Sequence, residues 1–324
     1  MALIKSIIIL IIGFALLMKG ADYFVEGSSS VAKQLHVPSM IIGMTIVAMG
    51  TSLPECAVSV TASLTGNNSL AVSNVVGSNI FNLMVVCGAC ALFAPLTIKK
   101  DTLKKEFPLS IICAVLLMVL GYVGMLLGHL DGGVFLLIFA AYLIWMIGSA
   151  KKARAAHKES QMMLEEGELV DEEIQILPLW KCALFIVGGM IAIKFGGDFV
   201  VDSASALASA FGLSQTLIGL TIVAMGTSLP ELVTSIVAAR KNEVDMALGN
   251  VIGSNIFNIL LVLGVAAAIS PVKFLTDNII DTVVLIAMSL VVLVFAWTSK
   301  MIDRREGATM LGMYAVYMAY ICIR

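Results

Sequence analysis

The amino-acid sequence predicts an all-α polytopic membrane protein with ten transmembrane helices, arranged as two inverted five-helix repeats, with both termini outside. Three observations support this prediction. The composition is far more apolar than that of a soluble protein, the second half of the chain repeats the first, and lysine and arginine gather in alternate loops. The composition indicates the class of protein, the repeat indicates its internal symmetry, and the basic loops indicate its orientation in the membrane.

Composition excludes most classes of soluble protein. Of the 324 residues, 60% are hydrophobic and 13% are charged, whereas a soluble domain is usually about 25% charged. The formal net charge of −2 argues against nucleic-acid binding, which needs a basic face. A transmembrane helix needs about 20 apolar residues, so the chain has room for about ten of them with short loops between.

Ten apolar segments follow one another along the chain, and two charged stretches interrupt them. Residues 99–106 and 151–173 together hold 17 of the 42 charged residues. We therefore expect a first five-span repeat over 1–150, a solvated cytoplasmic linker over 151–178, and a second five-span repeat over 179–324. The ten segments are about 3–26, 38–64, 69–94, 107–128, 132–150, 179–210, 214–239, 244–270, 278–298 and 306–323.

The two halves of the chain are copies of each other at an offset of 176 residues. The stretch TIVAMGTSLPE at 45–55 recurs at 221–231, and GSNIFN at 77–82 recurs at 253–258. Between 45–82 and 221–258, 22 of 38 aligned positions are identical. A unit with an odd number of spans enters the membrane from opposite sides in its two copies. We therefore expect inverted repeats, an arrangement typical of secondary transporters.

The basic residues predict the orientation. With the N-terminus placed outside, the inside loops hold 14 Lys and Arg residues and the outside segments hold 3. Cytoplasmic loops carry such an excess in membrane proteins. The count also supports ten spans, because a missed span would disturb the alternation. In a prokaryote the membrane would be the cytoplasmic (inner) membrane.

Two acidic residues, Glu55 and Glu231, lie near the middle of otherwise apolar segments. A charge at that depth costs several kcal/mol on insertion scales, so such residues are functional by default. The structural alternative is neutralisation by a neighbouring cation, but no lysine or arginine lies in the same central stretches. The two glutamates are therefore the leading candidates for a functional site.

Each glutamate follows a proline in the motif G-T-S-L-P-E. Pro54 and Pro230 lack a backbone N–H and clash with the preceding turn, which leaves a carbonyl without its helical partner in each half. Free carbonyls at membrane depth are tolerated only where another group satisfies them. The same turns also carry four hydroxyl groups, those of Thr51, Ser52, Thr227 and Ser228.

The motif G-S-N-I-F-N adds neutral oxygen atoms in each half. Ser78 and Asn82 are four residues apart and share one face of a helix, and Ser254 and Asn258 repeat this spacing. Four further asparagines repeat nearby: Asn74 and Asn250 lie one turn earlier on the same face, and Asn79 and Asn255 point elsewhere and are expected to bond between helices.

Together these groups are typical of a site for a hard cation. They comprise two carboxylates and many neutral oxygens, with no cysteine at matching positions in the two halves. Calcium takes six to eight oxygen ligands in flexible geometry, whereas transition metals favour histidine or cysteine. The residues therefore favour calcium or sodium, whose radii are similar. A proton is the alternative coupling ion, because neighbouring carboxylates readily share one.

The paired G-T-S-x-P-E and G-S-N-x-x-N/D motifs, in inverted repeats of five spans, resemble the calcium:cation antiporter superfamily. The resemblance covers essentially the whole chain and is strongest to the Na+/Ca2+ exchangers, especially the short prokaryotic members. It implies alternating access at the membrane midplane, transport of Ca2+ and Na+, and no cofactor. By position it implies a set of cation ligands made of Glu55, Glu231, Thr51, Thr227, Ser52, Ser228, Ser78, Ser254, Asn82, Asn258, Ala48 and Ala224, the last two through their carbonyls.

One position departs from the family pattern. Characterised exchangers commonly carry aspartate where this chain has Asn258, so both central positions are asparagine here. Two glutamates supply a charge of −2, which one calcium or two sodium ions neutralise, and a third sodium would leave a charge of +1. We therefore expect exchange that is electroneutral or partly proton-coupled, not the three-sodium stoichiometry common in the family. An obligatory potassium requirement is not expected either.

Three other functions fit part of the pattern. The nearest is a Ca2+/H+ antiporter on the same scaffold. An intramembrane hydrolase would use the two glutamates as acid and base, but it also needs a nucleophile or a metal, and the chain has no G-x-S-x-G and no H-E-x-x-H. A passive channel rarely needs an inverted duplication with a carboxylate in each half. The expected partners are Ca2+, Na+ and the lipid bilayer, with the oligomeric state left open.

Spans 1 and 6 lack the two motifs but carry Asp22 and Asp198 and many small residues. Two interpretations are open. The two spans could slide as a gate against the motif-bearing core, or their small residues could serve tight packing alone.

Overall fold

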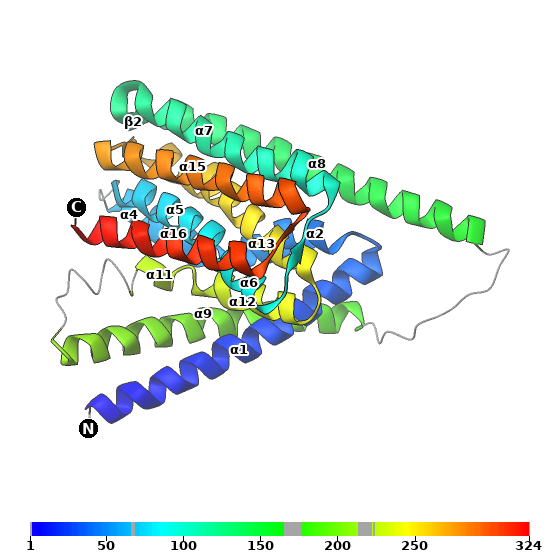
Figure 1. Cartoon of the computed structure of the whole chain (residues 1–324), viewed down its shortest axis with the longest axis horizontal. Helices are drawn as coiled ribbons and strands as arrows, with labels where there is room; N and C mark the ends of the chain where they lie inside the picture. The colour runs from blue at the N-terminus through cyan, green and yellow to red at the C-terminus, as the bar shows by residue number, and fades with distance from the viewer. Residues whose placement is uncertain (1, 66–68, 165–176, 213–221, 223, 324) are drawn as a thin grey trace.

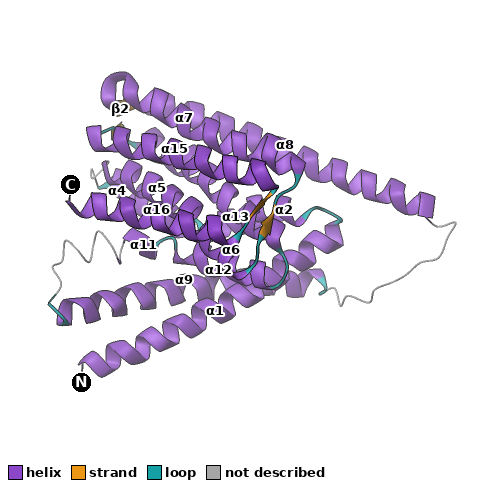
Figure 2. Ribbon diagram, in the orientation of Figure 1, coloured by secondary structure: helices purple, strands orange, loops and turns teal. Residues whose placement is uncertain are grey.

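The computed structural model describes residues 2–65, 69–164, 177–212, 222 and 224–323. Most of them form long helices that run roughly along one bundle axis (Figure 1). Figure 2 shows that β-structure is confined to short strands, each of two residues. The prediction of an all-α protein is confirmed.

Elements of the same kind follow in nearly the same order in the two halves. Segments η1, η2, η3 and η6 are π-helical, and η4 is a 3-10 turn. The first half comprises α1 (Ala2–Leu35), α2 (Ser39–Ile42), η1 (Gly43–Val47), α3 (Ala48–Thr51), α4 (Leu53–Leu64), α5 (Ser69–Phe81), η2 (Asn82–Val86), α6 (Cys87–Phe93), β1 (Leu96–Thr97), η3 (Thr102–Glu106), α7 (Phe107–Tyr122), η4 (Val123–Met125), β2 (Leu126–Leu127) and α8 (His129–Leu164). The second comprises α9 (Leu179–Ala210), α11 (Ala224–Gly226), α12 (Leu229–Arg240), α13 (Val244–Phe257), η6 (Asn258–Leu263), α14 (Gly264–Ile269), β3 (Val272–Lys273), α15 (Thr276–Ser299), β4 (Met301–Ile302) and α16 (Arg304–Ile323).

Within the described residues, eight helices are long and apolar enough to cross a membrane, and one bent pair of helices raises the number to nine. These nine correspond to nine of the ten predicted segments. The seventh predicted segment, 214–239, lies partly outside the described residues, so the count of ten stays a prediction. Both ends of the chain lie at the same end of the bundle in Figure 1, as an even number of crossings requires.

The two halves pair with each other reciprocally. Strand β1 of the first half pairs antiparallel with β4 of the second, and β3 of the second half pairs antiparallel with β2 of the first. In the same way α6 packs against α16, and α14 packs against α8. A two-fold relation between the repeats would produce such an exchange of partners. The opposite orientation of the two repeats in a membrane stays a prediction.

Helices α1 and α9 form a closely packed antiparallel pair along one side of the bundle (Figure 1). Glycines line their contact: a Cβ on Gly20 would lie 2.9 Å from Ala192 Cβ, and one on Gly196 would lie 2.8 Å from the Gly13 carbonyl oxygen. Small residues let helix backbones approach closely where lipid replaces water. The small residues of spans 1 and 6 therefore hold these two helices to each other.

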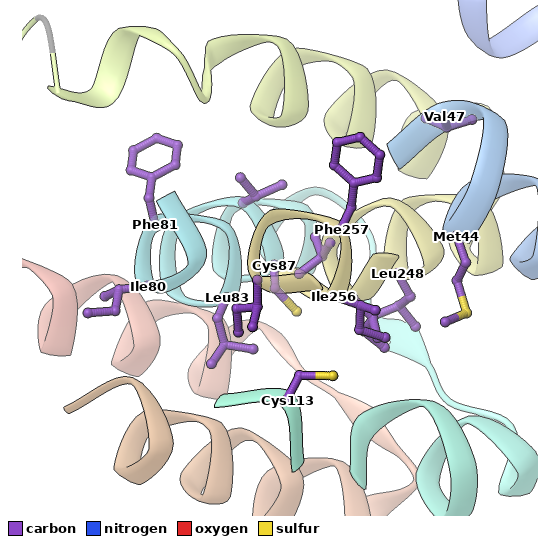
Figure 3. Close-up of a cluster of buried hydrophobic side chains, with 14 of the residues drawn as sticks. Met44, Val47, Ile80, Phe81, Leu83, Cys87, Cys113, Leu248, Ile256 and Phe257 are labelled. Atoms are coloured by element: carbon purple, nitrogen blue, oxygen red, sulfur yellow. The ribbon is translucent and has the colours of Figure 1, made fainter. Parts of the chain in front are cut away.

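The interior of the bundle is built from two segments, α5–η2–α6 and α13–η6–α14, and most residues of both are buried. Figure 3 shows Ile80, Leu83 and Cys87 of the first segment near Ile256 and Phe257 of the second, in one apolar cluster. Because neighbouring helices cover both segments, their polar side chains can be satisfied only by other buried groups or by a bound ligand.

Helix α8 is longer than the segment predicted for it, which ended at residue 150. The helix continues to Leu164 through the basic stretch KKARAAHK. Lysine, arginine and alanine are good helix formers, so the chain stays helical after the apolar pattern ends. The linker predicted over 151–178 thus begins as a helix that projects beyond the bundle (Figure 1), and residues 165–176 lie outside the described part.

Candidate cation site

Both halves interrupt their helix at the G-T-S-L-P-E motif, as predicted. In the first half, α3 ends at Thr51 and α4 begins at Leu53, and the helices on either side of Ser52 are bent by 49°. In the second half, α11 ends at Gly226 and α12 begins at Leu229. Each proline falls in the first turn of the new helix, where its missing N–H costs nothing. Each glutamate is then the third residue of its helix, near the N-terminal end whose partial positive charge favours a carboxylate.

The two glutamates are buried, and each accepts a hydrogen bond from the opposite half of the chain. Ser52 Oγ donates to Glu231 Oε1 at 2.7 Å, and Ser228 Oγ donates to Glu55 Oε1 at 2.9 Å. Glu55 and Glu231 are both 0% exposed. The structure therefore brings the two copies of the motif together at one place.

Glycines allow the second half to approach the broken span of the first half. A Cβ on Gly249 would lie 2.6 Å from the Met40 carbonyl oxygen, and one on Gly253 would lie 2.6 Å from Met44 Cα. Across this contact Thr51 Oγ1 donates to Asn250 Oδ1 at 3.1 Å. The close crossing of α13 over η1 and α3 thus positions one wall of the site.

Asn79 and Asn255 hold the two central segments together, as predicted for them. Asn79 Nδ2 donates to the Asn255 carbonyl at 3.1 Å, and Asn255 Nδ2 donates to the Asn79 carbonyl at 3.2 Å. Asn258 Nδ2 donates to Asn79 Oδ1 at 3.1 Å. Asn82 and Asn258 are fully buried and each begins a π-helical segment. Such π-helical turns occur frequently at functional sites.

Several buried polar atoms of the site have no hydrogen-bond partner within the described part of the chain. Native proteins leave few such atoms. Of the fourteen such atoms in the described part, eight belong to the predicted cation ligands: Oε2 of Glu55 and Glu231, Oγ of Ser78 and Ser254, Oγ1 of Thr227, Oδ1 and Nδ2 of Asn82, and Oδ1 of Asn258. All but the Asn82 nitrogen are oxygens, the ligand type that calcium and sodium take.

No side-chain cation is paired with either glutamate. The ion pairs between described residues lie elsewhere, and none of them includes Glu55 or Glu231. An unpaired carboxylate is costly to bury, so two of them at one site call for a cation or a proton from outside the chain. This disfavours the interpretation in which a neighbouring lysine or arginine satisfies the two acids.

The turn that follows Ala48 and the turn that follows Ala224 have different backbone hydrogen bonds. The Ala48 carbonyl accepts a hydrogen bond from Ser52 N at 3.1 Å, whereas the Ser228 N–H bonds to the Met225 carbonyl at 3.2 Å. Ala224 is the first residue of α11, and its side chain lies outside the described part. A role of either carbonyl as a cation ligand stays a prediction.

Two cavities lie between α9 and the broken turns. The first, of about 420 Å³, is lined by Thr51, Pro54 and Met190, and the second, of about 320 Å³, is lined by Thr227 and Asp198. Both cavities therefore reach residues of the predicted site, and residues of α9 line both. A movement of α9 relative to the broken turns would change the space beside Thr51 and Thr227.

The two predicted gating acids lie at different places. Asp198 lies on α9, where its carboxylate pairs with Lys194 at 2.5 Å. Asp22 lies on α1 and pairs with Lys241, just after α12, at 3.4 Å. The structure does not bring these two acids together, and neither is hydrogen-bonded to Glu55 or Glu231 in the described part.

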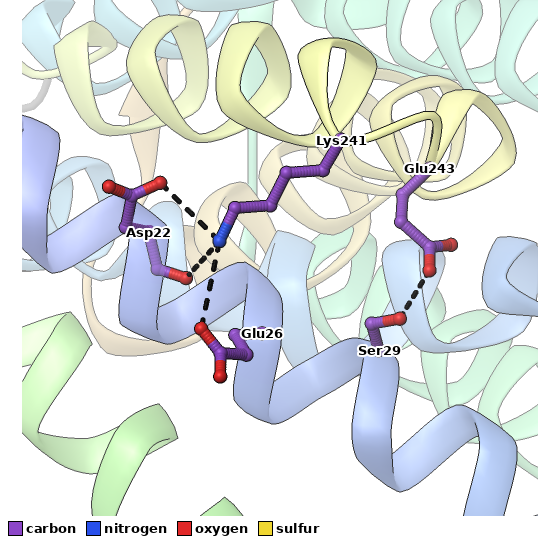
Figure 4. Close-up of polar contacts among 5 residues, drawn as sticks. All are labelled: Asp22, Glu26, Ser29, Lys241 and Glu243. Atoms are coloured by element: carbon purple, nitrogen blue, oxygen red, sulfur yellow. Dashed lines mark hydrogen bonds and ion pairs between the residues drawn. The ribbon is translucent and has the colours of Figure 1, made fainter. Parts of the chain in front are cut away.

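A group of charged residues ties α1 to the turn between α12 and α13. Figure 4 shows Lys241 between Asp22 and Glu26, with Glu243 beside Ser29. Lys241 Nζ lies 3.8 Å from Glu26 Oε2 and donates to the Asp22 carbonyl at 3.0 Å. Glu243 accepts a hydrogen bond from Ser29. We call Asp22, Glu26, Lys241 and Glu243 the inner ionic cluster.

Four residues that support the site are absent from the predicted ligand set. Asn74 Nδ2 donates to Ser59 Oγ at 3.0 Å, and Asn250 Nδ2 donates to Ser235 Oγ at 2.9 Å. Each serine lies one helical turn after a glutamate, and each asparagine lies one turn before the serine of the second motif. The repeat had already singled out Asn74 and Asn250, and the same duplication carries the signal for Ser59 and Ser235, which were not among the predicted residues.

Comparison with known proteins gives matches along nearly the whole chain. The family model for "sodium/calcium exchanger protein" matches residues 5–148 and 181–323. The putative antiporter CaxA of Alkalimonas amylolytica is 42% identical over 273 residues, which cover 83% of this chain and 82% of that protein. The inner membrane protein YrbG of Escherichia coli is 36% identical, with 97% and 95% covered. The solved structure of the sodium-calcium exchanger NCX_Mj matches with a TM-score of 0.82 at 31% identity, and covers 98% of this chain and 99% of that one.

Proposed function

The chain belongs to the sodium/calcium exchanger family, and we propose that it exchanges Ca2+ for Na+ across the membrane by alternating access. Members of this family are antiporters in a membrane, which assigns this chain to transport of calcium against another cation and not to an enzymatic reaction. We propose three further points: which cation is exchanged for calcium, which residues bind the ions, and how many ions are exchanged in each cycle.

The observation that carries the proposal is the meeting of Glu55 and Glu231 in one buried place. Their hydrogen bonds to Ser228 and Ser52 leave one oxygen of each carboxylate without a partner in the described part. A calcium ion between them would neutralise both charges, and the unpartnered oxygens of the second motif would complete its six to eight ligands. Two sodium ions would balance the same charge. Calcium and sodium would then compete for overlapping positions.

The predicted topology relates the two cavities to the membrane. Helix α9 would run from the inside to the outside, so Asp198 and the second cavity lie toward its outer half, whereas Val187 and Met190 of the first cavity lie toward its inner half. The inner ionic cluster would lie on the cytoplasmic side, where it joins α1 to the core. Alternation would follow if α1 and α9 moved together, because their glycine contacts join them to each other while ionic contacts join them to the core. This favours the gating interpretation for Asp22 over tight packing alone, whereas Asp198 pairs with Lys194 of its own helix and its gating role stays a prediction.

Lys241→Gln is expected to favour opening at the inner end. An exposed ion pair is worth about 0.2–1 kcal/mol, so loss of both pairs should shift the population by about 1 kcal/mol, which is about five-fold. The measurement is a spin-label distance between Leu35→Cys on α1 and Arg240→Cys on α12, in a background in which the two cysteines that are not buried, Cys56 and Cys322, are replaced by serine. We expect the fraction of molecules with a longer distance to rise about five-fold.

The matched control for this variant is Lys19→Gln. Lys19 is an exposed lysine of α1 and takes part in none of the ion pairs between described residues. Its replacement changes the charge by the same amount and should leave the distance distribution unchanged. If Lys241→Gln and Lys19→Gln give the same distribution as the unaltered chain, the inner ionic cluster does not hold α1 to the core.

The alternative function is Ca2+/H+ antiport, which two close carboxylates without a cationic partner could also support. Calcium-45 uptake into proteoliposomes separates the two. Uptake is measured under an outward sodium gradient, an outward proton gradient or no gradient. Sodium-driven uptake is the expected result. Uptake driven only by the proton gradient would show that protons, and not sodium ions, are exchanged for calcium at the same site. No uptake under either gradient would show that calcium is not the substrate.

A further inference from the structure

A third cavity, of about 410 Å³, lies away from the glutamate site, between the start of the broken span, η3 and α8. Part of its lining is apolar and includes Met40, Met44 and Met146, which are 7%, 2% and 3% exposed. Three lysines also line it, Lys99, Lys105 and Lys152. The cavity therefore combines an apolar wall with a basic rim, which the exchange of calcium and sodium does not use.

The cavity lies where two helices pass from apolar to basic sequence. In α8 the apolar stretch ends near Ser149 and the run KKARAAHK follows. In η3 the order is reversed, with KKDTLKKE before the apolar run that begins at Phe107. Trp145 lines the cavity nearly two turns before the basic run and is 38% exposed. Tryptophan is enriched at the boundary between lipid and water, so we expect the cavity to lie near that boundary.

The charge around the cavity is positive. Residues 99–106 hold four lysines and two acids, and residues 151–158 hold four basic residues and no acid. Lys105 pairs with Asp101 at 3.2 Å, and Lys99 pairs with Asp245. Lys152 takes part in none of the ion pairs between described residues, so its ammonium group remains available to an anion. The three lining lysines outnumber the two lining acids, Asp101 and Glu106, and the other basic residues of 151–158 add to this excess.

We propose that this cavity binds an anionic phospholipid, with its phosphate at the lysine rim and an acyl chain along the methionine wall. Basic pockets between transmembrane helices on the cytoplasmic side are suited to such headgroups, and the predicted topology places this cavity on that side. The apolar wall separates a lipid from free phosphate, which would use the rim alone. The bound lipid would brace α2 and η1, at the start of the broken span, against α8 and η3.

Native mass spectrometry of the full chain in detergent tests the proposal, with phosphatidylglycerol as the anionic probe and phosphatidylcholine as the zwitterionic one. Phosphatidylglycerol should be retained on the unaltered chain in preference to phosphatidylcholine. Lys152→Gln removes a charged hydrogen bond and should lower the affinity for phosphatidylglycerol about tenfold. The control is Lys151→Gln, which removes the same charge from the adjacent residue, outside the cavity lining. It should leave retention unchanged.

A second variant tests the apolar wall. Ala153 lines the cavity, and Ala153→Trp should fill it without changing any charge. Retention of phosphatidylglycerol should be lost in this variant while the protein still elutes as a folded species. Equal retention of the two lipids would overturn the proposal. Equal losses of phosphatidylglycerol retention in Lys151→Gln and Lys152→Gln would also overturn it, because they would show that the lipid is attracted only by the positive charge of the surface. Displacement of the lipid by millimolar inorganic phosphate would identify an anion site in place of a lipid site.

Discussion

Glu55→Gln and Glu231→Gln are each expected to lower sodium-driven calcium uptake by at least about 100-fold. Glutamine keeps the size of the side chain and can still accept the hydrogen bond from Ser228 or Ser52. It removes one of two negative charges, so a calcium ion in the site would retain an uncompensated charge. Leaving a buried charge unpaired costs about 3–5 kcal/mol, and about 2.7 kcal/mol corresponds to a factor of 100. Calcium-45 uptake into proteoliposomes measures the loss.

Three comparisons separate loss of the site from loss of the fold. The thermal unfolding temperature of ion-free Glu55→Gln should equal or exceed that of the unaltered chain, because one buried charge has been removed. Its rise on addition of calcium should be lost. Glu55→Asp keeps the charge and should transport at an intermediate rate. Asp277→Asn removes an exposed acid of α15, which lines neither cavity between α9 and the broken turns, and should transport normally. Retention of more than a third of the uptake in Glu55→Gln would show that this carboxylate is not a ligand.

Asn258→Asp is expected to convert voltage-insensitive exchange into voltage-dependent exchange. The site carries two carboxylates, and Asn258 is fully buried with Oδ1 unpartnered in the described part. A third carboxylate would balance a third sodium ion, so that one net charge crosses the membrane with each calcium. One charge across 100 mV is worth about 2.3 kcal/mol, which changes the equilibrium calcium ratio about 50-fold. The measurement is calcium accumulation in proteoliposomes at potentials clamped with potassium and valinomycin.

The neutral control for this variant is Asn258→Ser, which shortens the side chain without adding charge. It should remain insensitive to voltage even if its rate falls. The unaltered chain should accumulate calcium to the same ratio at 0 and 100 mV. The unaltered chain could instead show the voltage dependence expected for three sodium ions per calcium. In that case a group other than Glu55 and Glu231 contributes to the charge of the site, and the prediction of electroneutral exchange is wrong.

The sequence predicted most of the fold because its main signals are local. Long apolar segments predicted the helices, so α9 matches the predicted 179–210, and α13 to α14 matches the predicted 244–270 within one residue. Proline at a fixed place in the motif predicted the breaks at Ser52 and after Gly226. The extension of α8 to Leu164 was not predicted, because the polar run carries no apolar periodicity even though its residues favour a helix.

The site was predicted as a list of residues but not as an arrangement. The duplication identified Glu55, Glu231 and their neighbouring hydroxyls, since each appears twice in the same context. It did not predict that each glutamate accepts its hydrogen bond from the opposite half, because that exchange depends on how the two repeats pack. The pairing of Asp22 with Lys241 is likewise a tertiary contact between residues far apart in the chain. Single-residue patterns hold no information on such contacts.

The central claim is that Glu55 and Glu231 together hold the transported divalent cation. The most direct measurement is a crystal structure grown with strontium, which takes the place of calcium and scatters anomalously. The account predicts one anomalous peak between the two carboxylates, at a distance from oxygen close to the 2.3–2.6 Å that calcium takes. The peak should vanish in Glu55→Gln. A peak bound by only one of the two glutamates, or no peak at saturating strontium, would contradict the account.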